Sequence, residues 1–358
     1  MDLSIIIPLY NCENYLPLTF RVLESQELFH NKDINAEIIL VDDGSMDNTL
    51  SLAKIFQSER SNVTVISNSH KGLSETRNIG LKNSTGKYVY FMDCDDVLYP
   101  GCLKYFLKIA LKKEPEILIF GKENISEHDI EPIFSNPKCA KNDFRITFEG
   151  NSEKYILQTS YLIDQDCIWH KFFKKDFINL HNFKFDTNLI FAEDTLFTWQ
   201  TIALSSHILY VNFTGYFYVI RPQSYFHSAV KNTSRWKESK LQQQYLALSY
   251  HNFIKEHPAL TPNIKDSFKI KQHLFIFGYW AFILRKGICK DEMKELLKTQ
   301  YEAGIYPITT QYRSIFFEKG IKNYIFRALW IIVSNEFFLN AAMTVRNFQL
   351  KLLKLLRS

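Results

Sequence analysis

The sequence predicts an α/β fold with a mostly parallel sheet flanked by helices, followed by a helical C-terminal region. In roughly the first 120 residues, short apolar runs alternate with helical patterns at the spacing of β–α units. Two of these runs end in carboxylates, as expected for strands whose carboxyl ends meet at one edge of a sheet. From about Ser234 onward, apolar residues recur with helical spacing.

The composition is that of a globular protein of 358 residues, long enough for two domains. With 46% hydrophobic and 23% charged residues, the chain is not predominantly disordered. The net charge of +5 is mild and no basic-aromatic motif occurs, so we expect no nucleic acid partner. Free thiols in a reducing compartment are expected, because the six cysteines lack zinc-ligand spacing; they occupy positions 12, 94, 102, 139, 167 and 289.

The elements of the N-terminal third follow in order. Helices are predicted at 15–28, from Asp47, at 72–84 and from Pro100, with good N-cap chemistry at Asp47. The first run has no basic segment before it and breaks at Pro8, so it is interpreted as a strand and not as a signal peptide. No uninterrupted apolar run reaches the roughly 20 residues that span a bilayer. Strands are predicted at 3–9, 36–41, 63–66, 87–92 and 116–120.

The fourth predicted strand ends in three carboxylates, Asp93, Asp95 and Asp96. Unpaired buried carboxylates are costly, so we expect this strand to reach the sheet edge and present its acids in a crevice. Asp93 and Asp95 have the spacing to share a divalent cation through oxygen ligands. The alternative to a metal site is a plain acidic turn, and in either case we expect Asp96 to cap the next helix. The second predicted strand also ends in acids, at Asp43, and parallel pairing would bring them to the same edge.

Four segments resemble the signatures of the family 2 glycosyltransferases, which have the GT-A (nucleotide-diphosphosugar transferase) fold. They occur in the family's order within roughly the first 120 residues, and their combination is specific. The chain departs from the pattern at Cys94, where a serine is commoner. The segments are Ser4-Ile-Ile-Ile-Pro8-Leu-Tyr10-Asn11, Val41-Asp42-Asp43-Gly44-Ser45, Lys71-Gly72-Leu73-Ser74-Glu75-Thr76-Arg77 and Phe91-Met92-Asp93-Cys94-Asp95-Asp96.

This resemblance implies a nucleotide diphosphosugar donor, with UDP as the expected nucleotide. Pro8, Tyr10 and Asp43 would line the pocket of the base, and the Asp43 carboxylate would accept a hydrogen bond from an N–H of uracil. Arg77 and Asp93 would lie near the base, ribose and phosphates. The alternative for Arg77 is an arginine on a helix surface.

The resemblance also implies a metal cofactor, Mn²⁺ or Mg²⁺. Asp95, together with Asp93, would hold this ion against the diphosphate of the donor. Arg221 follows an aromatic strand at 216–220 and is a candidate to approach the same diphosphate; the alternative is a surface arginine.

A second acidic pair, Glu193 and Asp194, interrupts apolar sequence at the start of a helical run. The alternative to a functional role is a pair of charges that favours a helix N-terminus. From the resemblance, Asp194 would be the catalytic base, whereas Glu193 would orient the substrate or the helix end. Trp169 and His170 would belong to the acceptor wall; the alternatives are a core tryptophan and a satisfied core histidine.

We expect a GT-A catalytic domain at 1–230, with a donor half at 1–120 and an acceptor half at 121–230, and a helical region at 231–358. Helices are predicted there at 236–254, 264–284, 290–303 and 312–333. The last segment predicts an amphipathic helix on an anionic membrane surface. The alternatives are packing on its own domain or on a second subunit in a homo-oligomer. Its apolar side comprises Val345, Phe348, Leu352, Leu355 and Leu356, with lysines and arginines mostly opposite.

These observations predict an inverting hexosyl- or N-acetylhexosaminyltransferase that acts on a glycan or lipid-linked acceptor hydroxyl. An α-linked donor would give a β-linkage in surface polysaccharide biosynthesis, on the cytoplasmic face of the cell membrane. One alternative is a polyprenyl-phosphate sugar synthase. Another is a non-catalytic nucleotide-sugar-binding or scaffold protein, against which the intact set of Asp43, Asp93, Asp95 and Asp194 argues.

Overall fold

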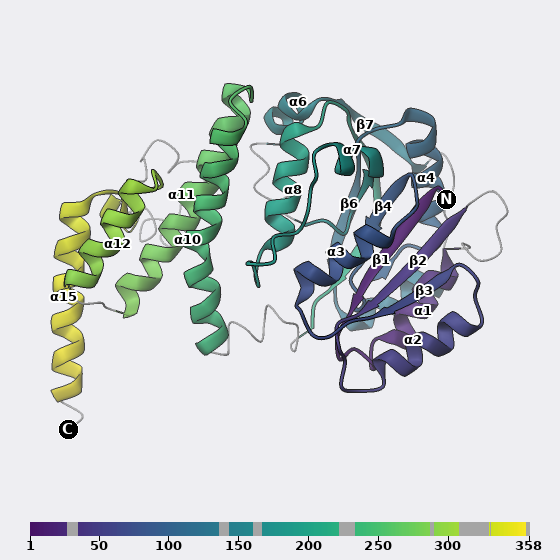
Figure 1. The fold of residues 1–358 in the computed structure, drawn as a ribbon, viewed down its shortest axis with the longest axis horizontal. Coiled ribbons are helices and arrows are strands. Elements are labelled where there is room, and N and C mark those ends of the chain that lie inside the picture. Colours follow the sequence, from purple (N-terminus) through teal and green to yellow (C-terminus); the bar gives the residue numbers. More distant parts are fainter. Residues whose placement is uncertain are drawn as a thin grey trace. The chain divides into compact units, whose positions relative to one another are not determined.

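The fold is known from a computed structural model that describes residues 1–26, 35–135, 143–159, 167–221, 233–286, 290–307, 329 and 331–355 (Figure 1). These residues form two compact units, Met1–Ser228 and Ala229–Ser358. The strands are β1 (Leu3–Leu9), β2 (Ala36–Asp42), β3 (Val63–Ser67), β4 (Tyr88–Phe91), β5 (Val97–Leu98), β6 (Ile117–Ile125), β7 (Arg145–Gly150), β8 (Lys171–Lys174) and β9 (Ile208–Val219). The helices of the first unit are α1 (Leu16–Ser25), α2 (Thr49–Ser58), α3 (Leu73–Asn83), α4 (Cys102–Lys113), α5 (Ile130–Ser135), α6 (Ser152–Gln158), α7 (Lys175–Leu180) and α8 (Glu193–Leu204).

The described strands form one sheet in the order β3-β2-β1-β4-β8-β6-β9-β5, with β7 paired to β9. The predicted α/β fold with flanking helices is therefore confirmed. Strands β3, β2, β1 and β4 are parallel neighbours, so their carboxyl ends lie at one edge. The register pairs Leu9 with Asp42, and Asp42 with Ser67. The loops that follow these strands therefore start side by side.

The second half of the sheet is mixed, because antiparallel β8 lies between β4 and β6. The sequence analysis did not predict β8. Its register pairs Tyr88 with Lys174 and Tyr90 with Phe172. Since β8 runs against β4, the residues just before β8 reach the carboxyl end of β4. This reversal brings the segment containing Trp169 and His170 to the edge where the acids lie.

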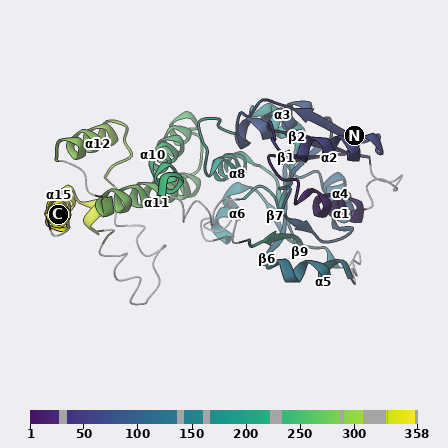
Figure 2. The same cartoon turned by 90° about the horizontal axis from the view of Figure 1, so that it is seen from below.

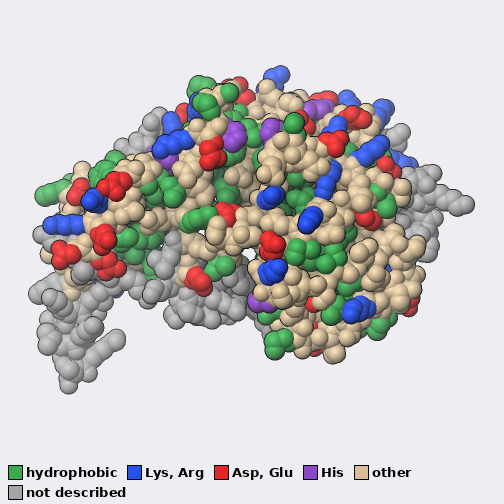
Figure 3. All heavy atoms as spheres, viewed as in Figure 1, with side chains coloured by type: hydrophobic (Ala, Val, Ile, Leu, Met, Phe, Trp, Pro, Cys, Tyr) green, Lys and Arg blue, Asp and Glu red, His purple; other side chains and the backbone are tan. Residues whose placement is uncertain are grey.

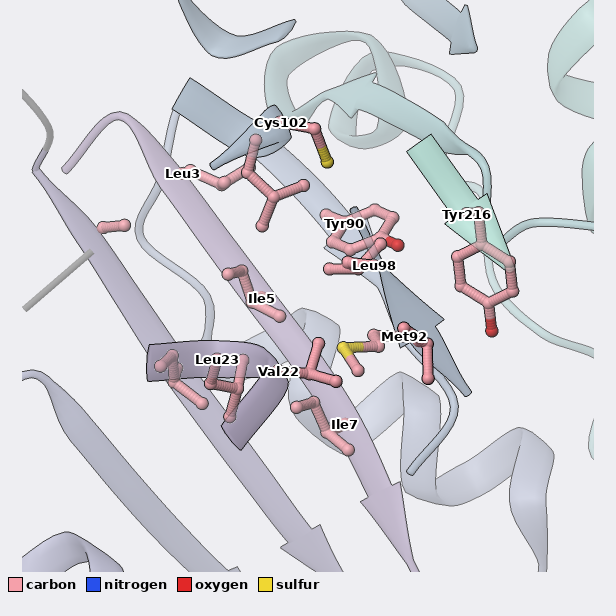
Figure 4. Packing of buried hydrophobic residues seen from close by; sticks show 14 of the residues in the cluster. Leu3, Ile5, Ile7, Val22, Leu23, Tyr90, Met92, Leu98, Cys102 and Tyr216 are labelled. Atoms are coloured by element: carbon pink, nitrogen blue, oxygen red, sulfur yellow. The ribbon is translucent and has the colours of Figure 1, made fainter. Parts of the chain in front are cut away.

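Helices cover both faces of the sheet (Figure 2). On one face, side chains of β1 and β4 pack against α1 and α4 in a continuous apolar core, of which Ile5, Val22 and Tyr90 are members (Figure 4). On the other face, α3 lies so close to β1 that a Cβ at Gly80 would be 2.3 Å from Ile6 Cγ2. A glycine is therefore needed for this contact, and the contact determines where α3 presents its polar residues.

The second unit consists of helices, namely α10 (Thr233–Glu256), α11 (Pro262–Lys286), α12 (Lys290–Glu302) and α15 (Glu336–Leu355). Leu339 and Met343 of α15 are buried in its core with Trp280, whereas Val345 is 59% exposed. The first turns of α15 thus pack within their own unit. The predicted helix at 312–333 lies mostly outside the described residues, and so do the side chains of α15 beyond Asn347.

No described helix is long and apolar enough to cross a membrane. The cysteines that the structure describes, Cys12, Cys94, Cys102 and Cys167, are free thiols. The other two, Cys139 and Cys289, lie outside the described residues.

Candidate active site

The first group of predicted residues surrounds the Asp43 carboxylate just after β2. Asp43 is buried, and its two oxygens accept hydrogen bonds from the backbone N–H groups of Lys71 and Gly72 at 2.8 and 2.9 Å. His70 Nδ1 lies 2.9 Å from Asp43 Oδ2. The ring of Tyr10, at the end of β1, is stacked on His70 with a centroid distance of 4.3 Å. Asp43 therefore organises the loop before α3, and Tyr10 remains 45% exposed.

Two neighbours of this group were not singled out from the sequence. One is His70, which combines an ion-pair distance to Asp43 with the Tyr10 stack. The other is Asn68, just after β3, whose side-chain Nδ2 is buried and has no hydrogen-bond partner in the described parts of the chain. Buried amides are normally satisfied, so this donor is a ready position for a polar ligand atom. Pro8 lies in β1, paired with Val41.

Arg77 is the centre of the second group. It is not a surface residue, because only 3% of its side chain is exposed. Its guanidinium donates from Nη2 to Asp93 Oδ1 at 2.9 Å and from Nη1 to Glu193 Oε1 at 2.5 Å. Burial lowers the pKa of Arg77, but the charges of Asp93, Glu193 and Asp194 raise it by more, so the guanidinium is charged. One buried cation thus joins the end of β4 to the start of α8, through a contact between Arg77 and Glu193 that spans 116 positions of the sequence.

Asp194 lies in the first turn of α8 and accepts a hydrogen bond from the backbone N–H of Thr195 at 2.8 Å. Its pKa is raised from 3.8 to about 7, first by burial and then by the charge of Glu193, while Arg77 opposes the rise. A simple helix-terminal charge would have an ordinary or lowered pKa. A carboxyl group that titrates near neutral pH is well matched to proton transfer.

Asp95 faces Arg221, whose Nη1 lies 3.4 Å from Asp95 Oδ2. Arg221 is buried and also pairs with Glu127 at 3.0 Å, so it is not a free surface arginine. Burial raises the pKa of Asp95 and the charge of Asp93 raises it further, against the effect of Arg221. The side chain of Asp93 is 29% exposed and that of Asp95 is 33% exposed.

These two carboxylates, Asp93 and Asp95, suit a divalent cation. They supply hard oxygen donors, and their negative charge is offset only in part, because Arg77 is shared with Glu193 and Arg221 with Glu127. In the described part of the chain, no group of three or more histidine, cysteine or acidic side chains gathers as a metal site. Any cation held here would therefore take further ligands from a substrate or from water, as Mg²⁺ usually does.

The prediction that Asp96 caps the next helix is wrong. Helix α4 begins at Cys102 after a left-handed Gly101, well beyond Asp96. The Asp96 carboxyl is buried and accepts hydrogen bonds from Tyr216 Oη at 2.5 Å and from the backbone N–H of Val219 at 2.8 Å. Burial raises its pKa well above the ordinary value, and the charges of Asp95 and Asp93 add to the rise. Asp96 therefore ties the acidic segment to β9.

Trp169 and His170 have different environments. The Trp169 ring is half-buried and stacks on Tyr216 with a centroid distance of 4.3 Å. His170 is buried, with Nδ1 2.7 Å from the carbonyl oxygen of Phe120 and Nε2 2.7 Å from Lys171 Nζ. Burial lowers the pKa of His170 far below its usual value, and the charges of Lys171 and Lys122 lower it further. His170 is thus a neutral histidine with the surroundings of a core residue, whereas part of Trp169 remains accessible.

The sequence was compared with known proteins. Residues 4–179 match the model of glycosyl transferase family 2. The uncharacterized glycosyltransferase EpsJ of Bacillus subtilis is 26% identical over 253 residues, which is 70% of this chain and 69% of EpsJ. The glycosyltransferase GlyA of Streptococcus pneumoniae is 26% identical over 234 residues, and the minor teichoic acid biosynthesis protein GgaB of B. subtilis is 25% identical over 270. These matches span only 31% of GlyA and 27% of GgaB.

Solved structures share the fold. S. aureus TarS 1–349 in complex with UDP-GlcNAc has a TM-score of 0.60 at 16% identity, over 93% of this chain and 90% of that one. The mannosyltransferase PcManGT of Pyrobaculum calidifontis, in complex with GDP-Man and Mn²⁺, has a TM-score of 0.51 at 14% identity, over 97% and 87%. With its family domain at residues 4–179 and its GT-A fold, the chain belongs to glycosyl transferase family 2 and is a glycosyltransferase.

Proposed function

We propose that this protein transfers a hexosyl or N-acetylhexosaminyl group from a UDP-sugar to a hydroxyl group of a bacterial surface glycan or its lipid-linked precursor. The observation that carries the proposal is the buried bridge from Asp93 through Arg77 to Glu193. It joins the acids at the end of β4 to Asp194, whose pKa is raised to about 7. This bridge supports the proposal because it would hold the donor site and the general base in one connected group.

The base of the nucleotide would lie between Tyr10 and the loop that Asp43 organises. Tyr10 offers an exposed aromatic ring, and Asn68 offers a buried amide donor with no partner among the residues that the structure describes. Aromatic stacking and a few directed polar groups are how small-molecule sites usually recognise a planar base. The structures of similar fold were solved with UDP, UDP-GlcNAc or GDP-Man, which supports a nucleotide sugar as donor.

Asp95 and Asp93 would hold Mn²⁺ or Mg²⁺ at the diphosphate. When bound, this ion would supply positive charge that stabilises the departing nucleotide diphosphate. Arg221, already paired with Asp95, would contribute a second positive charge on the same side. Arg77 would hold Asp93 in a constant position, because its guanidinium is itself buried and held by two acids.

Asp194 would take the proton from the acceptor hydroxyl as that oxygen attacks the anomeric carbon. Attack from the side opposite the leaving diphosphate inverts the configuration, so an α-linked donor gives a β-linked product. A base positioned in this way contributes roughly 10²- to 10⁴-fold to the rate. Glu193 would act indirectly, since it holds Arg77 and raises the pKa of Asp194.

The acceptor proposal draws on the relatives. One of them, GgaB, is a minor teichoic acid biosynthesis protein, which supports a polymer of the bacterial envelope as the acceptor. Attachment to an anionic membrane surface through the end of α15 remains part of the proposal. Its support is the cluster of lysines and arginines there, Arg346, Lys351, Lys354 and Arg357.

The decisive test is a screen of UDP-sugars for hydrolysis and transfer by the purified protein, with and without EDTA. We expect turnover with one donor class, loss of turnover in EDTA, and recovery with Mn²⁺ or Mg²⁺. The variant Asp95→Ala should lose most of the metal-dependent activity. Full turnover in EDTA, or in Asp95→Ala, would contradict the assignment of the metal site. A β-configured product identified by NMR would support inversion, and an α-configured product would exclude it.

A further inference from the structure

Lys122, on β6, differs from Arg77 and Arg221 in that its two contacts, with Cys167 and Trp169, are with neutral groups. Arg77 pairs with Asp93 and Glu193, and Arg221 pairs with Asp95 and Glu127. The ammonium group of Lys122 instead donates to Cys167 Sγ at 2.9 Å and lies 4.9 Å from the centre of the Trp169 ring. Within the described ranges, no carboxylate is paired with it.

Neither partner neutralises this charge. Burial raises the pKa of the Cys167 thiol, against the effects of Lys171 and Lys122, so the sulfur stays protonated and neutral. The indole ring offers only its quadrupole, which is worth about 0.5–2 kcal/mol to a cation. Lys122 is half-buried, so part of its hydration has been removed, and none of the described carboxylates is paired with it as a counter-charge. An anion that bound here would therefore gain a full electrostatic interaction.

The position of Lys122 connects it to the acceptor side. Trp169, which it contacts, stacks on Tyr216, and Tyr216 donates a hydrogen bond to Asp96 in the acidic segment. The backbone carbonyl of Trp169 accepts a hydrogen bond from Tyr90 Oη in β4 at 2.8 Å. Cys167, the other partner of Lys122, is close enough to Asp194 for that charge to act on its thiol. Lys122 thus lies beside the aromatic ring that a sugar acceptor would contact.

An anionic acceptor would also respond to the charges on the surface of the first unit. Basic and acidic side chains are interspersed over the face in Figure 3, without a large region of one sign. A localised cation next to Trp169 would therefore decide whether a charged acceptor is preferred over a neutral one.

We infer that Lys122 selects an acceptor that carries an anionic oxygen group, a phosphate or a carboxylate, close to the hydroxyl that receives the sugar. This inference rests on the proposed glycosyl transfer and adds the chemical class of the acceptor. The ammonium group would form a charge-assisted hydrogen bond with the anion, while Trp169 contacts the carbon skeleton. No chemical step changes, since Lys122 only binds and orients the acceptor.

The test compares acceptors that differ in one charge. Two pairs serve, glycerol 3-phosphate with glycerol, and methyl glucuronide with methyl glucoside. With the donor identified by hydrolysis, kcat/KM is measured for each acceptor in the native protein and in Lys122→Met, Lys122→Arg and Lys112→Met. Lys112 is exposed on α4 and serves as the matched control. Circular dichroism establishes that each variant is folded.

In the native protein we expect one charged acceptor to be preferred by roughly 10- to 100-fold, equivalent to about 1.4–2.8 kcal/mol at 1.4 kcal/mol per tenfold change. Lys122→Met should bring this ratio close to one, whereas Lys122→Arg and Lys112→Met should retain it. Preference for the phosphate or for the carboxylate distinguishes the two sources of charge. A native ratio near one, or an unchanged ratio in Lys122→Met, overturns the inference.

A binding measurement covers the case in which transfer to these small acceptors is too slow to follow. The protein is saturated with UDP and Mn²⁺, so that the donor site is filled, and is then titrated calorimetrically with each charged acceptor. At least tenfold weaker binding of the preferred anion to Lys122→Met supports the inference. Equal affinity, or no binding to the native protein, overturns it. Failure of UDP itself to bind would instead count against the proposed function.

Discussion

Replacing Asp194 by asparagine should remove activity and, at the same time, stabilise the fold. The carboxyl group is held in a place that disfavours its ionised form, because it is buried and lies beside Glu193. Asparagine has nearly the same shape, and its amide oxygen can still accept the hydrogen bond from the backbone N–H of Thr195. The substitution therefore removes an unfavourable charge while leaving the local contacts in place.

The size of this effect follows from the pKa of Asp194, which rises from 3.8 to about 7 on folding. This is about 3 pH units, and at about 1.4 kcal/mol per unit the ionised group costs the folded state at most about 4 kcal/mol. Asp194 is not fully shielded from solvent, so we expect about 1–3 kcal/mol. The sign follows from proton binding. Below pH 3.8 the carboxyl group is protonated in both the folded and the unfolded state, so it does not reduce the stability of the fold. Above pH 7 it is ionised in both states, and the full destabilisation of the folded state is present.

The assay is thermal unfolding of the full chain and of Asp194→Asn at pH 8 and at pH 4.5, with kcat measured for the same preparations. At pH 8 the variant should melt at a higher temperature and turn over roughly 10²- to 10⁴-fold more slowly. At pH 4.5 most of the difference in stability should disappear. If the variant is no more stable than the native protein at pH 8, the ionised Asp194 carboxylate does not destabilise the fold. If the variant retains full turnover, Asp194 is not the base.

Three further predictions concern the same acids and the end of the chain. Glu193→Gln should move the acidic limb of the kcat/KM profile to lower pH by roughly one unit, because a charge that raises the pKa of Asp194 is removed; an unmoved limb would count against this coupling. Arg77→Met should lower the free energy of unfolding by about 3–5 kcal/mol, measured with urea, because two acids lose their buried partner. A cost below 1 kcal/mol would mean that the bridge is dispensable. Lys351→Glu with Lys354→Glu should weaken binding to vesicles with anionic lipids at least tenfold without removing the buried Met343, and equal binding would exclude a membrane role for this segment.

Much of the fold was predictable because the N-terminal third has a simple pattern, in which apolar strands alternate with helices. The first strand was predicted at 3–9 and is observed at Leu3–Leu9, since a run buried on both faces is mostly apolar. The second, predicted at 36–41, is observed at Ala36–Asp42 and ends at its acids. Parallel strands align their carboxyl ends, so the meeting of these acids at one edge also followed from the sequence. The family of the protein followed from the same segments, and it is confirmed.

The partners of the site residues depended on contacts that local sequence patterns do not encode. Strand β8 has only four residues, and its antiparallel place between β4 and β6 depends on two distant partners. Arg77 had the sequence context of a helix-surface arginine, yet it meets Glu193 across 116 positions, and that contact makes it a buried bridge. Asp96 had the spacing of a helix cap, yet it bonds to β9.

The sequence by itself thus determined which residue types end the strands, because burial and strand pairing restrict what can stand there. Only the tertiary structure decided which charges compensate one another, because the electrostatic energy of a buried group depends on neighbours in space and not on neighbours in the chain. Lys122 is a further instance, since its lack of a carboxylate partner among the described residues becomes evident only when Cys167 and Trp169 are seen beside it.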